Sequence, residues 1–141
     1  MARIDIRFLL LATVCLTAGV SMGIVMGIRH DFSLAPVHAH LNLLGWTSLG
    51  LFGLAYRAWP DLREGWSARL HFVLSAPAAV LFPIGIYLSI MHQQPMLAIV
   101  AAFLWLGGVL TFLGKLARLA LAMREEATEA APVPALPMPA E

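Results

Sequence analysis

Hydrophobic residues are concentrated in four long stretches of this chain, and polar residues fall almost entirely between them. The stretches cover residues 6–28, 37–59, 69–91 and 95–117. An α-helix needs about 20 apolar residues to cross roughly 30 Å of hydrocarbon, so each stretch is long enough to span a membrane. The pattern therefore predicts an all-α fold, a four-transmembrane-helix bundle with very short connections.

The composition agrees with this class and limits the partners. The 141 residues are 60% hydrophobic and 12% charged, whereas soluble domains contain about 25% charged residues. The net charge is +1 and the chain has no basic cluster, which argues against nucleic acid as a partner. We expect residues 1–124 to form one transmembrane domain in the lipid bilayer. The last segment, 125–141, predicts a disordered cytoplasmic tail, because its Ala, Pro and Glu residues offer too little apolar surface to offset ordering entropy.

The positively charged residues predict an orientation. If the chain crosses the membrane at the four predicted stretches, eight of the nine Lys and Arg residues lie on the same side. They are Arg3, Arg7, Arg57, Arg63, Arg69, Lys115, Arg118 and Arg124. Only Arg29 lies on the other side. Cytoplasmic loops carry the excess of Lys and Arg, so both termini are predicted to be cytoplasmic, in a bacterial inner membrane.

Glycines in the first stretch indicate a contact surface. Gly19, Gly23 and Gly27 follow one another at four-residue spacing, so they lie on one helix face and let a neighbouring backbone approach closely. The sequence leaves two partners open for this face: the second stretch of the same chain, or the first stretch of another copy.

Histidines are the candidate chemistry. Four of the five, His30, His38, His40 and His92, fall at the predicted outer ends of the helices. An imidazole in or near hydrocarbon is costly unless it has a partner, so such residues are candidates for a functional site. Iron in haem, copper and zinc all accept imidazole ligands.

Helical geometry separates the two central histidines. His38 and His40 are about 200° apart around a helix axis, so one metal cannot readily bind both, and each should face its own partner. Asn42, a further candidate for cofactor binding, lies one turn after His38, on a stripe that looks buried against protein and continues through Gly45, Leu49, Phe52 and Tyr56. Pro36 suits the first helical turn, where the helix dipole keeps both rings neutral and able to coordinate metal. The alternative is that both rings merely satisfy backbone carbonyls and water.

Two segments carry a resemblance to a known family. "HAHLNLLGWTSLGLFGLAYRAWP" resembles the tenth helix of haem–copper oxidase subunit I, and "ARLHFVLSAPAAVLFPIGIYL" is similar to the eleventh. The four stretches would then match the last four helices of that subunit, over residues 5–117. The resemblance implies that His38 ligates a high-spin haem and His40 a low-spin haem. It also implies a structural role for His71, which opens the second segment.

The chain also differs from this family in ways that bear on its function. The helices that supply its copper site and its second low-spin haem ligand are missing from this chain. No acidic residue lies within any apolar stretch after Asp5, although oxygen reduction needs proton pathways. We therefore do not expect a complete oxidase.

The sequence leads to one expected function and two alternatives. We expect a homo-oligomeric membrane protein that binds haem b near the outer surface through His38 or His40, with Arg29 beside a haem propionate. His92, His30 or a histidine of another copy would supply a second ligand. Its role would be electron transfer, gas or haem binding, or support of a respiratory complex or small redox protein. The alternatives are a copper- or zinc-binding protein that uses the outer histidines without haem, and a cofactor-free accessory subunit.

Overall fold

The computed structural model describes residues 3–129, and every element within that part of the chain is helical, which confirms the all-α prediction. The elements are α1 (Ile4–Arg29), α2 (Ala35–His40), the π-helical segment η1 (Leu41–Ser48), α3 (Leu49–Ala58), the short 3₁₀ turn η2 (Pro60–Arg63), α4 (Trp66–His92) and α5 (Met96–Glu129). Three of them, α1, α4 and α5, are long and apolar enough to cross a membrane.

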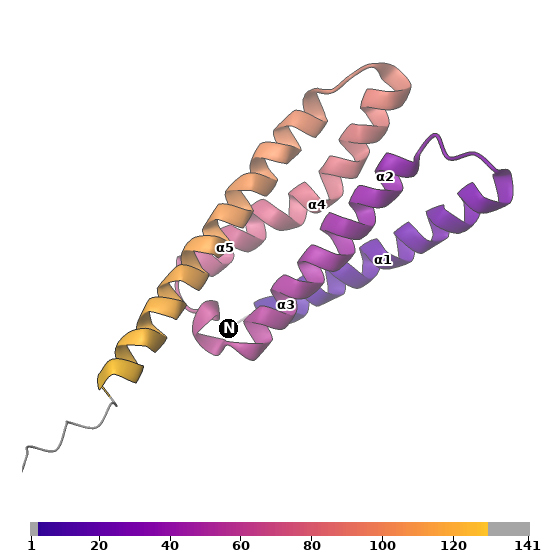
Figure 1. The fold of residues 1–141 in the computed structure, drawn as a ribbon. Helices are drawn as coiled ribbons and strands as arrows, with labels where there is room; N and C mark the ends of the chain where they lie inside the picture. The colour runs from indigo at the N-terminus through magenta and orange to yellow at the C-terminus, as the bar shows by residue number, and fades with distance from the viewer. Residues whose placement is uncertain (1–2, 130–141) are drawn as a thin grey trace, which may run out of the picture.

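The second predicted stretch is helical from residue 35 to residue 58, but its backbone changes type on the way. α2, η1 and α3 follow one another as a single column (Figure 1). Across η1 the hydrogen bonds have the wider π-helical spacing. Ser48 Oγ likewise donates to the carbonyl of Leu43, five residues earlier, at 2.8 Å. The sequence pattern gave no sign of this π-helical segment.

The helices form two hairpins that lie against each other (Figure 1). α1 packs along the column of η1 and α3, and α5 packs along α4. α4 also contacts α1 and α2, so it joins the two hairpins. We call the end of the bundle with the start of α1, η2 and the start of α4 the inner end. The outer end holds the end of α1, α2 and the turn between α4 and α5.

The helix α5 continues past the predicted end of the transmembrane domain. Its last five residues, 125–129, fall in the segment predicted as a disordered tail. The Leu, Ala, Met, Arg and Glu residues around this point are good helix formers, and Thr128 Oγ1 donates to the carbonyl of Arg124 at 2.9 Å. The remainder of the predicted tail, 130–141, lies outside the described residues.

The best-packed part of the molecule lies toward the inner end. Its buried cluster contains Phe8, Ala12, Leu49, Tyr56, Leu62, Ala68 and Ala79. Partly buried aromatic residues surround this cluster, among them Phe52, Phe72 and Phe112. Toward the outer end, glycines instead let the side chains of α1, α2 and η1 approach closely.

Candidate functional site

The ring of His38 lies against the glycine face of α1. Its Nδ1 is 3.0 Å from the carbonyl oxygen of Gly19, and since a carbonyl only accepts, Nδ1–H must donate. A Cβ on Gly23 would lie 2.9 Å from Cε1 of the same ring, so a larger residue there would displace the histidine. Gly19 and Gly23 of the glycine face therefore pack on the column of α2, η1 and α3 of the same chain. This is one of the two partners that the sequence left open.

Asn42 extends the same contact by one turn. Its Nδ2 donates to the backbone carbonyl of His38 at 2.8 Å, and a Cβ on Gly19 would lie 2.5 Å from that nitrogen. One turn further, a Cβ on Gly45 would lie 2.6 Å from Cβ of Cys15. The rest of the predicted stripe, through Leu49, Phe52 and Tyr56, is buried or half-buried, as its spacing predicts.

His40 faces the other hairpin. Its Nδ1–H donates to the carbonyl of Pro36, with 2.8 Å between the nitrogen and the oxygen, and its ring centroid is 5.1 Å from that of Phe82 on α4. His38 and His40 therefore diverge, one toward α1 and one toward α4, in agreement with their 200° separation. A proton on Nδ1 satisfies the carbonyl contact of each ring, and in that tautomer of the neutral ring the Nε2 lone pair is the coordinating atom; metal-binding histidines usually have this arrangement.

The other predicted ligands lie at the rim of the outer end. His30 is the left-handed C-cap of α1, with φ of 50°, and His92 is the last residue of α4; both side chains are exposed, as is Arg29. Within residues 3–129, no group of three or more His, Cys, Asp or Glu side chains is placed to hold a metal ion. The role of the four outer histidines as metal ligands therefore stays a prediction.

The fifth histidine lies at the centre of the inner end. His71 is fully buried, and its Nδ1 is 2.9 Å from the hydroxyl oxygen of Tyr56. Aromatic rings surround it, with centroids 5.0 Å away for Phe8, 4.6 Å for Phe52 and 5.0 Å for Phe112. Its other nitrogen, Nε2, has no hydrogen-bond partner among the described residues.

Sequence reasoning gave His71 only a structural role and missed its hydroxyl partner. One signal was present: Tyr56 lies three residues before the turn at 59–65, and His71 lies six residues after it. A tight turn between two helices brings positions on either side of it close together. Periodicity along a single helix does not reveal a pair of this kind.

A second buried polar group lies one turn further along α4. Ser75 is fully buried, and its Oγ has no hydrogen-bond partner within the described part of the chain. Its hydroxyl occupies the space that a side chain on Gly108 of α5 would fill. One turn before His71, Ser67 Oγ accepts a hydrogen bond of 3.0 Å from Nζ of Lys115.

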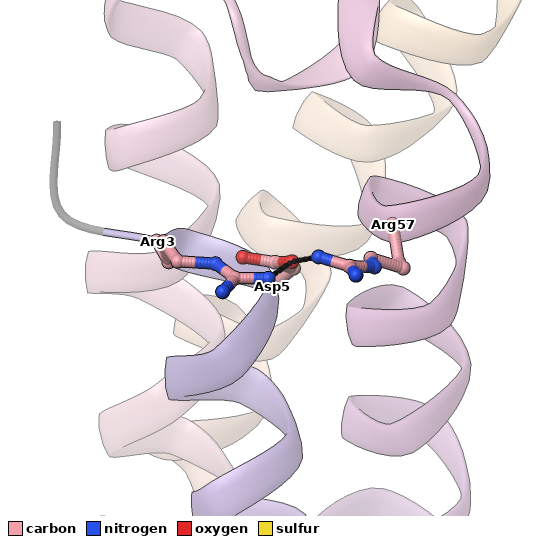
Figure 2. Close-up of polar contacts among 3 residues, drawn as sticks. All are labelled: Arg3, Asp5 and Arg57. Atoms are coloured by element: carbon pink, nitrogen blue, oxygen red, sulfur yellow. Dashed lines mark hydrogen bonds and ion pairs between the residues drawn. The ribbon is translucent and has the colours of Figure 1, made fainter.

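A carboxylate at the inner end ties α1 to α3. Figure 2 shows Arg3 and Arg57 on either side of Asp5. The Oδ2 atom of Asp5 is 3.5 Å from Nη1 of Arg57 and 3.6 Å from Nη2 of Arg3. The carboxylate is fully buried, whereas the two arginine side chains are more than half exposed. Because solvent screens exposed guanidinium groups, these ion pairs position the helix ends more than they stabilise them.

Comparison with family models, with curated proteins and with solved structures finds no match for this chain. The resemblance to haem–copper oxidase subunit I therefore stays a prediction from the sequence motifs. Two features of the structure can support chemistry: the anchored imidazoles at the outer end and the buried polar groups at the inner end.

Proposed function

We propose that this chain is a four-span integral membrane protein of the bacterial cytoplasmic membrane, with both termini on the cytoplasmic side. Besides α1, α4 and α5, the remaining span would be the helical column at residues 35–58, the second along the chain. At 1.5 Å per residue this column is long enough to cross the hydrocarbon. Large apolar side chains project outward from every span, including Val14, Leu51, Val73 and Phe103. The excess of basic residues at the inner end supports the orientation.

We further propose that the outer end binds haem b through His38 or His40. The observation that supports this most directly is that the Nδ1–H of each ring donates to a backbone carbonyl, which presents Nε2 as a ligand. A Cβ on Gly27, one turn beyond the His38 contact, would meet no atom within 4 Å among the described residues, so the glycine face of α1 is open at that position. Bound there, the haem would supply one-electron chemistry or a position for a diatomic gas.

The second ligand and the assembly belong to the same proposal. His30 and His92 are exposed at the rim of the outer end, where another copy of the chain can reach them. Arg29 is exposed beside His30 and would pair with a haem propionate. A homo-oligomer that binds haem in this way would serve in electron transfer, in gas or haem binding, or in support of a respiratory complex or small redox protein.

An absorption spectrum of the purified protein, prepared with haem and metals supplied, tests the proposal. We expect Soret and alpha bands. If the protein instead contains stoichiometric copper or zinc and lacks these bands, the cofactor is a metal ion and not haem. Such a metal site would need histidines from more than one copy. Neither bands nor metal would indicate a cofactor-free accessory subunit, in which both rings serve only their backbone contacts.

Single variants identify the ligand. His38→Ala and His40→Ala should each be compared with Thr47→Val, a matched change to an exposed polar residue of the same helical column. We expect at least one histidine variant to lose or shift the haem bands, while Thr47→Val leaves them unchanged. Unchanged bands in both histidine variants would contradict the assignment. His30→Ala and His92→Ala then show whether a rim histidine supplies the second ligand.

A further inference from the structure

Three polar residues form a stripe on the face of α4 that packs on α5. Ser67, His71 and Ser75 follow at four-residue spacing, which places them on one side of the helix. α4 and α5 lie side by side along this region (Figure 1). The stripe runs from the inner end of the bundle into its interior.

The stripe starts at a groove on the inner end. The groove has a volume of about 640 Å³ and lies between the η2 turn, the start of α4 and the middle of α5. Ser67 and Lys115 both line it, and Nζ of Lys115 donates to Ser67 Oγ and to the carbonyl of Glu64, each at 3.0 Å. Water in this groove therefore reaches the first polar residue of the stripe.

The other two residues of the stripe meet α5 deeper in the bundle. The ring of Phe112 stacks on His71 with an interplanar angle of 25°, and Gly108 makes room for the Ser75 hydroxyl. His71 Nε2 and Ser75 Oγ are fully buried, and neither has a protein partner within residues 3–129. Because an unsatisfied buried polar atom costs about 1–3 kcal/mol, protein interiors almost always pair such atoms with protein or with bound water.

We propose that the Ser67–His71–Ser75 stripe is a hydrated path along which protons from the inner aqueous side reach the buried Tyr56–His71 pair. A hydronium ion in the path would transfer its proton to Nε2 of His71, which leaves a water molecule and an imidazolium. The Nδ1–H of that imidazolium donates to the hydroxyl oxygen of Tyr56, and the reverse transfer returns the proton to the path. The path rests on the proposed membrane topology and does not require haem at the outer end.

This path would change what the lack of acidic residues in the apolar stretches implies. The apolar stretches contain no carboxylate after Asp5, which by itself argues against proton entry. An imidazole between two serine hydroxyls supplies an exchangeable group without a carboxylate.

Cysteine accessibility tests the path. The single native cysteine is removed by Cys15→Ala, and Ser67→Cys and Ser75→Cys are compared with Ala76→Cys, which is buried at the same depth as Ser75 but off the stripe. A small membrane-impermeant methanethiosulfonate is added to vesicles from either side. Thiols react as thiolates, which need water, so both stripe variants should react at least about tenfold faster than Ala76→Cys, and only from the inner side. Equal rates for Ser75→Cys and Ala76→Cys would overturn the proposal.

A second measurement uses the unsubstituted chain, because a cysteine substitution can itself disturb the fold. The protein is labelled with ¹⁵N-histidine in lipid nanodiscs, and the His71 resonance is assigned by its loss in His71→Gln. We expect the His71 ring to exchange magnetisation with water even though the side chain is fully buried. A His71 ring without any water contact would overturn the proposal.

Discussion

The two ends of the bundle hold their histidines in different ways. At the outer end, His38 and His40 are only partly buried, and each is fixed by one backbone carbonyl. At the inner end, His71 is fully buried among aromatic rings and bonded to the Tyr56 hydroxyl. An outer ring can therefore offer Nε2 directly to a group that arrives from outside, whereas the protein groups in contact with the inner ring are all enclosed in the bundle. Burial and neighbours, more than residue type, decide what an imidazole can do here.

The largest expected difference between the ends is in packing. Phe8 is fully buried and contacts four aromatic rings, so Phe8→Ala should lower the free energy of unfolding by about 3–5 kcal/mol. Val37→Ala, at a buried position of α2, should cost roughly 1–2 kcal/mol because it removes only two carbon atoms. Unfolding in mixed detergent micelles measures both. Equal losses would mean that the outer end is packed more tightly, for each carbon atom removed, than the inner end.

The glycine contact gives the next largest effect. Gly19→Val would push on the Asn42 amide and on the neighbouring His38 ring, at a cost of about 1–3 kcal/mol. Gly27→Val is the matched control, because nothing described lies within 4 Å of a Cβ there, and it should change stability by less than about 0.5 kcal/mol. The same unfolding assay applies. If Gly27→Val proved as harmful as Gly19→Val, the outer contact would extend beyond α2.

The Tyr56–His71 hydrogen bond should contribute less. Tyr56→Phe keeps the ring and leaves His71 Nδ1 without its partner, so we expect a loss of about 0.5–1.5 kcal/mol. Tyr87→Phe, at an exposed position of α4, should change stability by less than about 0.5 kcal/mol. The ¹⁵N resonances of His71 should shift in Tyr56→Phe only. An unshifted resonance would show that the hydrogen bond does not form.

The smallest effect is expected at the buried carboxylate. Asp5→Asn should cost less than about 1 kcal/mol, because its arginine partners are more than half exposed and screened by solvent. Added salt should reduce the difference between Asp5→Asn and the unsubstituted chain. The control is Asp31→Asn, in an exposed turn where the Asp31 carboxylate accepts from the backbone N–H of Ser33. A loss of several kcal/mol at Asp5 alone would make the ion pair a main support of the inner end.

The helices themselves could be predicted from the sequence because apolar length is a local property. The predicted stretches 6–28 and 69–91 differ from α1 and α4 by at most three residues at either end. The stretch at 95–117 begins within one residue of α5, and the helix continues beyond it to Glu129, since a helix of good formers needs no membrane to continue. The divergence of His38 and His40 was also predictable, because it follows from the angle per residue alone.

The sequence by itself thus determined the helical class, the approximate helix bounds and the faces that each helix presents. Only the tertiary structure decided which faces meet: the glycine face of α1 with His38, Tyr56 with His71, and Ser75 with Gly108. The reason is physical. Periodicity fixes where side chains lie around one helix axis, whereas a contact between helices depends on their crossing and on relative depth, which all the packed side chains set together.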